Sequence, residues 1–568
     1  MSAFLIANLA PIMFAVLILF LLLGFPVAFA LAANGIVFGL IGIQLGLLHP
    51  ALFGALPERV FGVMSNESLL AVPFFTFMGL ILERSGMAED LLETIGQLFG
   101  PVRGGLAFAV IFVGALLAAT TGVVAASVIS MGLISLPIML RYGYDKRLAS
   151  GVIAASGTLA QIIPPSLVLI IMADQLGRSV GDMYAGAFVP GFVLTGLYAL
   201  YVIGIAIFNP KAAPALPPEA RTLREENGSN GYVSLLVLAA ISTAAALAST
   251  KTYLLDAATD ETIVVSIMSG MGLAFLAALI NRATGLGLLS RLAEKVVFVL
   301  VPPLALIFLV LGTIFIGLAT PTEGGAMGAT GALVMATLRR RLSWKLLKQA
   351  LDSTAKLTTF VVFILIGARI FSLTFYGVDG HKWVEHLLSD MPGGQLGFLI
   401  FVNLLIFFLA FFLDFFELSF IIVPLIGPVA DKLGIDLIWF GVLLGVNMQT
   451  SFMHPPFGFA LFYLRSVAPA KVKTSDIYWG AVPFVLIQIV MVGLIIAFPK
   501  LVTMGVTKQP QMDATKAEKL IEQQENSGAA AAPKEGAGSA TSNVPEEEDA
   551  GKAFERAVRE QSGAGSGK

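Results

Sequence analysis

Two segments of the chain carry one pattern, GYDKRLASGVIAASGTLAQIIPPS at residues 143–166 and GIDLIWFGVLLGVNMQTSFMHPPF at residues 434–457. They align without a gap at an offset of 291 residues, and the offset also holds for one upstream proline. In full, the recurring positions are Pro137, Gly143, Asp145, Pro164 and Pro165, which return as Pro428, Gly434, Asp436, Pro455 and Pro456. Each copy follows a long apolar stretch. The chain therefore contains an internal repeat.

Composition places the repeat in a membrane. Hydrophobic residues make up 57% of the 568 residues and charged residues 13%, against roughly 45–50% and about 25% in soluble domains. Cys is absent, the four His show no metal-ligand spacing, and no HExxH, Walker A or GxSxG motif occurs. The net charge of −2 gives no broad basic face for nucleic acid. These observations exclude a soluble enzyme.

Apolar stretches of about 20 residues, enough to cross a ~30 Å hydrocarbon layer, predict about twelve transmembrane helices. They lie near 4–24, 26–48, 67–83, 147–173, 185–208, 231–250, 263–281, 298–318, 323–338, 350–375, 437–465 and 475–499. Two longer stretches, 105–140 and 395–430, are each either two spans or one re-entrant hairpin. Composition alone does not decide between these alternatives.

Charge placement favours hairpins. If both long stretches return to the side that they enter, every second loop is basic, and the positive-inside rule places those loops in the cytoplasm. The basic loops hold Arg103; Arg141, Lys146 and Arg147; Lys211, Arg221 and Arg224; Arg282, Arg291 and Lys295; Arg339, Arg340, Arg341, Lys345 and Lys348; Arg465, Lys471 and Lys473. Full crossings would abolish this asymmetry. We expect both termini outside and an all-α integral membrane fold.

In this topology the first hairpin opens to the cytoplasm and the second opens outside, so the halves are inverted repeats, as in many secondary transporters. We assign 1–208 and 298–504 to the halves, and 209–297 to a cytoplasmic loop, a two-span insertion and a connector. Residues 505–568, rich in Ala, Gly, Ser, Pro and Glu, are expected to form a disordered tail. Within the halves, hairpin 105–140 precedes broken helix 147–173, and hairpin 395–430 precedes broken helix 437–465.

Each proline pair falls midway along a span. Proline removes a backbone donor and clashes with the preceding turn, so free carbonyl groups remain at bilayer depth. Facing hairpin tips and broken helices make oxygen-rich cages for a small cation, and helix N-termini there can hold an anionic group. The plain alternative is a kink in a packed helix.

These residues resemble the large membrane subunit of TRAP (tripartite ATP-independent periplasmic) transporters. The matching segments are LLAVPFFTFMGLILERSGMAEDL (69–91), SLPIMLRYGYD (135–145), IIPPS (162–166), LATPTEGGA (318–326) and LGIDLIWFGVL…HPPFGFALF (433–462). The resemblance runs from about residue 5 to residue 500. The DFFELSFIIVPLIGPVADKLGID form is similar to the branch labelled mannitol/chloroaromatic compound transport. Relative to the family, segment 231–281 resembles a two-span insertion.

The resemblance implies a function. Members of this family are secondary transporters in the bacterial inner membrane that import a small carboxylate with a sodium gradient and an elevator motion. They work with a four-helix small membrane subunit and a periplasmic substrate-binding protein. Sodium is the coupling ion, and no other cofactor or metal is implied.

The family's cation sites map onto two sets of residues in this chain. The first set is Thr121, Gly122, Ala160, Ile163 and Pro165, and the repeat places the second on Leu413, Asp414, Ser451, His454 and Pro456. The chain departs from the family twice, at Thr121-Gly122-Val123 where Ser-Gly-Ser is usual, and at His454 where threonine is usual. The histidine leaves open whether sodium or protonation governs the second site.

Polar residues at membrane depth are candidates for substrate binding. Arg369 is either a clamp on the substrate carboxylate, a partner of Asp414 or Glu417, or a side chain that reaches the interface. Asp414 and Glu417 could ligate a cation or cap a helix. We expect Glu323 to cap a helix as well. The other substrate candidates precede the breaks at matching repeat positions, where polar groups also join membrane helices: Ser156, Thr158, Asn447 and Gln449.

Two rival functions remain open from the sequence. One is a stand-alone ion-coupled carrier or antiporter that needs no binding protein. The other is an integral-membrane enzyme that uses Asp414, Glu417 and His454 as acid–base groups, although catalysis would not require a second proline pair in an inverted copy.

Overall fold

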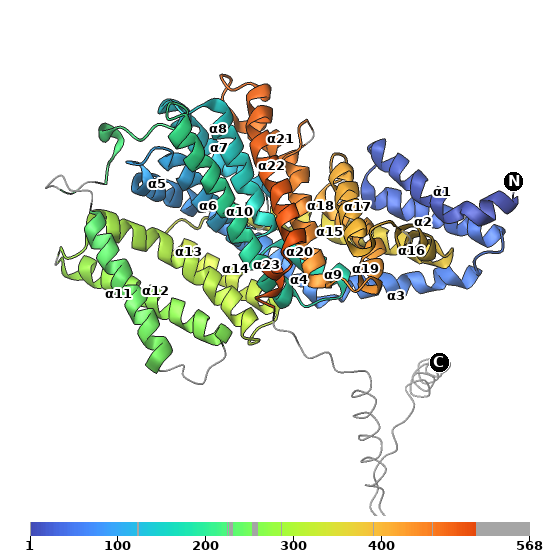
Figure 1. Cartoon of the computed structure of the whole chain (residues 1–568). Coiled ribbons are helices and arrows are strands. Elements are labelled where there is room, and N and C mark those ends of the chain that lie inside the picture. The colour runs from blue at the N-terminus through green and yellow to red at the C-terminus, as the bar shows by residue number, and fades with distance from the viewer. Residues whose placement is uncertain are drawn as a thin grey trace, which may run out of the picture. The chain divides into compact units, whose positions relative to one another are not determined.

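The computed structural model describes residues 2–121, 124–223, 225, 231–252, 259–285, 287–389, 391–456 and 458–506, and the regular structure of these residues is helical, without strands (Figure 1). The predicted tail lies outside them, apart from residues 505 and 506. The helices are α1 (Ser2–Leu22), α2 (Val27–Gln44), η1 (Pro50–Ala55), α3 (Leu56–Met64), α4 (Glu67–Arg84), α5 (Met87–Phe99), α6 (Gly105–Thr121), α7 (Val124–Arg141), α8 (Lys146–Thr158), η2 (Leu159–Gln161), α9 (Leu167–Leu176), α10 (Val180–Phe208), η3 (Pro218–Ala220), α11 (Tyr232–Thr252), α12 (Thr259–Thr284), α13 (Arg291–Phe315), α14 (Pro321–Leu338), α15 (Trp344–Gly377), α16 (Gly380–Ser389), α17 (Gly394–Leu409), α18 (Phe415–Ile421), α19 (Val423–Lys432), α20 (Leu437–Met448), η4 (Gln449–Phe452), α21 (Phe459–Val467), α22 (Thr474–Ala497) and α23 (Lys500–Thr503).

Both long apolar stretches are re-entrant hairpins, as predicted. At the ends of the first, the Gly104 amide donates to Ala213 and the Asp145 amide donates to the adjacent Ala212, both over 2.9 Å. At the ends of the second, the Gln395 amide group donates to the carbonyl of Leu433 over 2.5 Å. Residues before and after each stretch therefore lie on the same side, which a single full crossing would forbid.

The two broken helices repeat in detail. Asp145 and Asp436, 291 positions apart, cap α8 and α20, and the carboxylate of each accepts the backbone amides of residues two and three positions later. Each helix then tightens into a 3-10 turn, η2 or η4, before its proline pair. A second short helix follows each pair and ends at repeat-equivalent residues, Leu176 and Val467.

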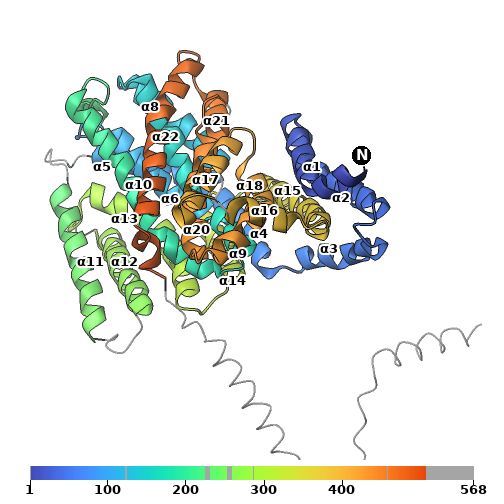
Figure 2. The ribbon, with the colours of Figure 1, turned by 45° about the vertical axis from the view of Figure 1, so that its right-hand side comes forward.

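The helices cover the predicted membrane crossings. By length and composition, nine of the described helices can cross a membrane, or up to eleven if each of two bent pairs is one span. The broken crossings are built from helices too short for this test, since α8 has 13 residues and α9 has 10. The predicted insertion is a pair of helices, α11 and α12, that lie side by side next to α13 (Figures 1 and 2). The predicted half boundaries stay predictions.

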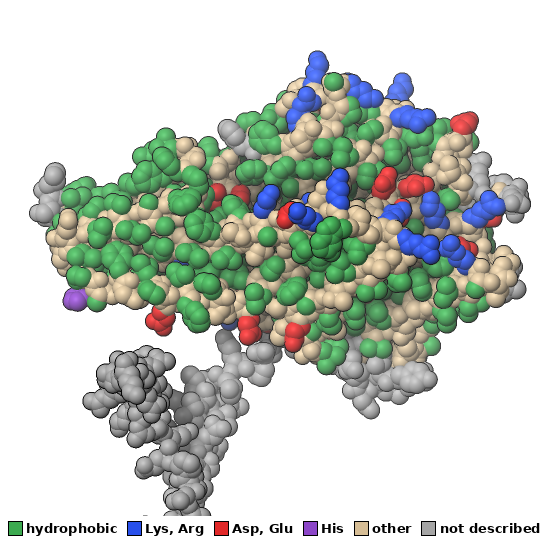
Figure 3. Space-filling model, turned by 180° about the vertical axis from the view of Figure 1, so that it is seen from behind, with side chains coloured by type: hydrophobic (Ala, Val, Ile, Leu, Met, Phe, Trp, Pro, Cys, Tyr) green, Lys and Arg blue, Asp and Glu red, His purple; other side chains and the backbone are tan. Residues whose placement is uncertain are grey.

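The halves exchange packing partners. Helix α2 packs against α15 of the second half, and α14 packs against α4 of the first. The surface agrees with a membrane setting: the face shown in Figure 3 is covered largely by apolar side chains, and its basic side chains gather toward one end.

Hydrogen bonds and ion pairs join the loops into two layers. In the basic layer, the Lys146 ammonium donates to the carbonyl of Lys471 over 2.7 Å, and Lys295 pairs with Glu93 at 3.0 Å. The opposite layer is joined by Asn66 with Asp174, Arg178 with Asp431, and Lys432 with Glu385. This is the separation of basic and non-basic loops expected from the sequence.

Helices α8 and α22 cross with their backbones in contact at two glycines. A Cβ atom on Gly480 would overlap the carbonyl oxygen of Arg147, and one on Gly151 would overlap the carbonyl oxygen of Gly480. Backbone atoms cannot move aside as a flexible side chain can. The crossing therefore requires glycine at both positions.

We expect Gly480→Ala to destabilise the protein by about 1–3 kcal/mol, because the methyl group overpacks this crossing. The measurement is the free energy of unfolding in detergent. Gly493→Ala on the same helix is the matched control, since a Cβ there has no neighbour within 4 Å. Equal stability of the two variants would contradict the close crossing.

Candidate functional site

The two breaks meet through repeat-equivalent residues. The Gln449 side chain donates from Nε2 to the backbone carbonyl of Thr158 over 3.0 Å, and the two positions are 291 apart in the sequence. Both side chains are buried. The ends of α8 and α20 thus contact each other where an axis relating the two halves must pass.

A second buried amide joins this centre from α22. Gln488 Nε2 donates to the hydroxyl of Tyr198 over 2.9 Å and, more weakly, to Thr158 Oγ1 over 3.4 Å. Thr158 Oγ1 itself donates to the carbonyl of Ala155 over 2.8 Å. The Oε1 atoms of Gln449 and Gln488 are buried and accept no hydrogen bond from the described residues. Since buried polar atoms are nearly always paired, the centre offers two free acceptors at membrane depth.

Sequence reasoning did not single out Tyr198 or Gln488. Each is one polar side chain within a long apolar helix, α10 or α22. Such residues are signals for helix contacts in membranes. What the sequence does not show is that these two meet at Thr158.

In the first half, Ala160, Ile163 and Pro165 all lie buried around the break. Among the described residues, no group donates a hydrogen bond to the carbonyl oxygens of Ile163 or Pro165. The predicted cation role of these oxygens stays a prediction. The side chain of Thr121 and all of Gly122 lie outside the described residues.

The second half differs at the equivalent atoms. The carbonyl of His454 accepts the amide of Gly458 over 2.6 Å, and the carbonyl of Pro456 accepts the hydroxyl of Tyr478 over 3.1 Å. Ser451 is also buried, and its hydroxyl donates to the carbonyl of Met448 over 2.6 Å. One lone pair on each of these carbonyl oxygens is therefore already used within the chain.

His454 lies in an aromatic cage. Its ring stacks on Phe411, with centroids 4.3 Å apart and planes at 19°, and Phe407 meets it edge-on at 4.3 Å. Both ring nitrogens are buried and form no hydrogen bond with the described residues. An imidazole in this setting supplies no oxygen ligand, unlike the threonine usual in the family.

Asp414 and Glu417 form a capping box. The Glu417 carboxylate accepts the amide of Asp414 over 2.9 Å, and the Asp414 carboxylate accepts the amide of Glu417 over 3.0 Å. Of the two roles open from the sequence, the structure displays the cap at the start of α18. Buried Leu413 precedes it. Glu323 forms the same motif with Thr320 at the start of α14, as expected.

Arg369 on α15 is half-buried, and it forms no ion pair with any carboxylate in the described part of the chain. The predicted alternative of pairing with Asp414 or Glu417 is therefore not what this structure contains. A buried guanidinium is costly unless an anion or water balances it.

The remaining substrate candidates divide into two kinds. Asn447 donates to the carbonyl and the side-chain oxygen of Asn403 over 2.8 and 3.1 Å, so it joins α20 to α17. Ser156 is fully buried, and its hydroxyl has no partner among the described residues. Ser156 Oγ and Gln449 Oε1 are thus the free polar atoms of this set.

A helical membrane chain with two hairpins and two broken helices that meet at a polar centre is a multi-pass transporter subunit. Residues 14–501 match the family described as the tripartite ATP-independent periplasmic transporter, DctM component. The chain belongs to this family. The family recognised from the sequence is confirmed, whereas the mannitol/chloroaromatic branch stays a prediction. The chain is a transport subunit of the bacterial inner membrane rather than an enzyme.

Two relatives found by sequence agree with this assignment. The chain is 26% identical to the C4-dicarboxylate TRAP transporter large permease protein DctM of Pseudomonas aeruginosa, over 80% of this chain and 89% of the relative. It is 24% identical to the sialic acid TRAP transporter permease protein SiaT of Haemophilus influenzae, over 79% of this chain and 61% of that longer protein. A solved structure, the YdaH transporter of Alcanivorax borkumensis, matches with a TM-score of 0.46 and 16% identity, covering 79% of this chain and 88% of that one.

We expect Gln449→Leu to destabilise the protein by about 0.5–1.5 kcal/mol, because it removes the buried hydrogen bond to the carbonyl of Thr158. The measurement is the free energy of unfolding in detergent. Gln44→Leu, at the exposed end of α2, is the control. A loss no larger than that of the control would show that the two breaks do not depend on this bond.

Proposed function

We propose that this chain is the membrane-embedded subunit of a binding-protein-dependent secondary transporter that imports a small carboxylate with a sodium gradient. The observation that carries the proposal is the contact of the two breaks, Gln449 with Thr158, inside a chain of the DctM family. The relatives are named for C4-dicarboxylate and sialic acid, and both substrates carry carboxylate groups. We expect a small membrane subunit and a periplasmic binding protein as partners.

The proposed motion is an elevator, in which the hairpins and broken helices move as one body. Support comes from the packing of α8 against α22 and of α20 against α9 and α10, which holds the breaks of both halves together. The exchanged pairs, α2 with α15 and α4 with α14, are candidates for the static part.

The direct test is uptake of labelled organic acids into proteoliposomes that hold this chain and its small-subunit partner. Uptake that requires both an inward sodium gradient and the binding protein is the expected result. Uptake that is indifferent to the binding protein would instead favour the stand-alone carrier.

We assign the substrate carboxylate to Arg369, with the free atoms of Ser156 and Gln449 as further contacts. The support is the lack of an ion pair for Arg369 among the described residues, which leaves its guanidinium for an external anion. Arginine can bind a carboxylate through two parallel hydrogen bonds, and lysine cannot.

Arg369→Lys is therefore expected to raise the KM of uptake about tenfold or more, since hydrogen bonds to charged groups contribute about 1.5–3 kcal/mol. Arg178→Lys is the matched control, because Arg178 is exposed and pairs with Asp431. An unchanged KM, measured in the proteoliposome assay, would remove Arg369 from the substrate site.

We place the coupling cation in the first half alone. In support, the carbonyls of Ile163 and Pro165 have no donor among the described residues, whereas those of His454 and Pro456 have one each. Sodium binds oxygen atoms, and the aromatic cage of His454 supplies none.

Sodium dependence of uptake should then fit one site, with a Hill coefficient of about 1. The double variant His454→Thr with Tyr478→Phe restores a hydroxyl and frees the Pro456 carbonyl, so it should raise the coefficient above that of the parent. Tyr478→Phe alone is the control. A parent coefficient near 2 would contradict the one-site assignment without touching the carboxylate assignment.

A further inference from the structure

A cavity of about 410 Å³ lies away from the breaks, between helix α5, the hairpin arms α6 and α7, and the segment after α10. Gln97 holds that segment in place, since its side chain donates to the carbonyl of Ala220 and accepts the amide of Thr222, both over 3.0 Å. Leu216 is fixed by a bond from its amide to the carbonyl of Gly100 over 2.8 Å. The cavity is therefore bounded by ordered chain on all of these sides.

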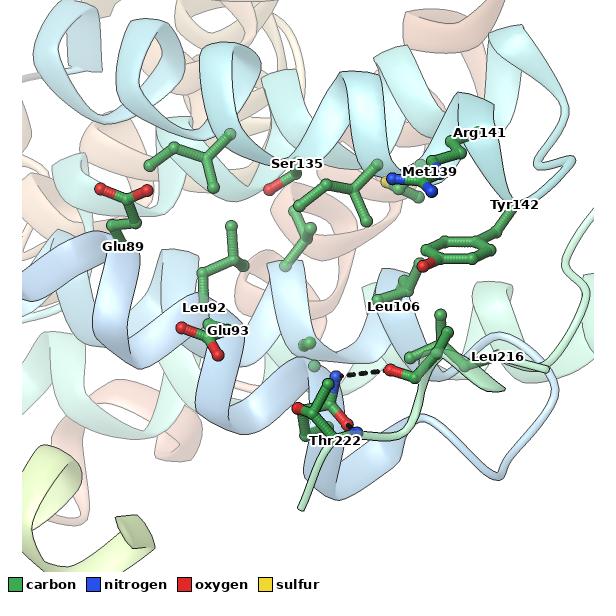
Figure 4. Close-up of a pocket in the computed structure, with 17 residues that line it drawn as sticks. Glu89, Leu92, Glu93, Leu106, Ser135, Met139, Arg141, Tyr142, Leu216 and Thr222 are labelled. Carbon is green, nitrogen blue, oxygen red and sulfur yellow. Dashed lines mark hydrogen bonds between the residues drawn. The ribbon is translucent and has the colours of Figure 1, made fainter. Parts of the chain in front are cut away.

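The two ends of the cavity carry opposite charges. Figure 4 shows Glu89 and Glu93 at one end, Arg141 and Tyr142 at the other, and Ser135 between them. Glu93 already pairs with Lys295 at 3.0 Å. Glu89 and Arg141 form no ion pair with any residue that the structure describes. One carboxylate and one guanidinium thus remain for a ligand.

Ser135 supplies an independent sign of a polar ligand. It is 3% exposed, and its Oγ atom has no hydrogen-bond partner among the described residues. A buried hydroxyl without a partner costs free energy. Ser135 lies about 9 Å before Arg141 on α7, toward the start of that helix, at ~1.5 Å per residue. Apolar side chains such as Val110 and Ile134 line the wall around it.

The charges and the position of the cavity define one class of ligand. A dicarboxylate would be repelled at Glu89, and a simple cation would be repelled at Arg141, so the ends favour a zwitterion. The cavity lies where α7 ends in the basic loop layer, and Ile138 on its wall is 40% exposed to the surroundings of the chain. A phospholipid with a zwitterionic headgroup fits both features, because its headgroup carries both charges and its acyl chains can extend along the exposed apolar wall.

We propose that this cavity binds the headgroup of a phospholipid with a primary amine, that is, a phosphoethanolamine lipid. The ammonium group pairs with Glu89, and the phosphate, which lies between the amine and the glycerol esters, accepts a hydrogen bond from the Ser135 hydroxyl and pairs with Arg141. Lipid bound there contacts both arms of the first hairpin. The site is separate from the transport site proposed above and does not depend on it.

The test is native mass spectrometry of the purified, delipidated chain titrated with phosphatidylethanolamine or phosphatidylcholine of the same acyl chains. We expect about tenfold or greater preference for the primary amine, because a quaternary ammonium cannot donate the hydrogen bond to Glu89. Glu89→Gln should abolish the preference. Arg141→Gln should weaken both lipids alike, and Ser135→Ala should weaken both modestly while leaving the fold intact.

Matched controls lie in exposed positions outside the cavity. Glu58→Gln on α3 and Arg103→Gln in the loop before α6 remove one charge each and should leave lipid retention unchanged. Equal binding of the two lipids would overturn the amine assignment. Displacement by soluble glycerophosphoethanolamine as effective as that by the intact lipid would identify a water-soluble solute instead, and retention unchanged in all three cavity variants would remove the site.

Discussion

A proline pair in the middle of a membrane-crossing segment leaves carbonyl oxygens that no amide of the same helix can reach, and hydrocarbon offers no replacement. In this structure the two breaks lie next to each other, and glycine residues allow neighbouring helices to pack closely around them. Gly151 and Gly480 let α8 and α22 touch through their backbones, and Gln449 reaches across to Thr158. The Gln449 side chain thus supplies one donor where the breaks meet, whereas the carbonyls of Ile163 and Pro165 have none among the described residues.

The sequence predicted those features that appear as a pattern along the chain itself. A fixed offset disclosed the repeat, and alternating charge predicted that each long stretch returns to the side that it enters, which the bonds at Gly104 and Asp145 confirm for the first stretch. The centre itself depends on residues that are far apart, since Tyr198 and Gln488 are 290 positions from each other and meet only after packing. The three-residue spacing of Asp414 and Glu417 fits a ligand pair or a cap equally well. Only their backbone amides, each within reach of the other's carboxylate, display the cap.

Helix α5 joins parts of the chain that are distant in sequence. Its Asp90 pairs with Arg339 and Arg341 of the loop after α14, at 3.2 and 2.9 Å, and its Glu93 pairs with Lys295 at the start of α13. The same helix packs against α6 of the first hairpin. Exposed ion pairs contribute little stability individually. Their effect here is to link the first hairpin to α13 and α14 through α5. Any movement of the hairpin relative to those helices must bend α5, move it along with the hairpin, or break its ion pairs.

The inverted repeat gives the two halves equivalent positions but not equivalent chemistry. Where the first half has Ile163 with a free carbonyl, the second has His454, whose carbonyl is bonded to Gly458 and whose ring is held between two phenylalanines. Where the first has Ser156 with a free hydroxyl, the second has Asn447, which is bonded to Asn403. At these two pairs of positions, the second half bonds polar atoms within the chain that the first half leaves without a partner. A transporter built this way can bind its ion and its substrate asymmetrically, although corresponding helices and breaks recur at one offset in its two halves.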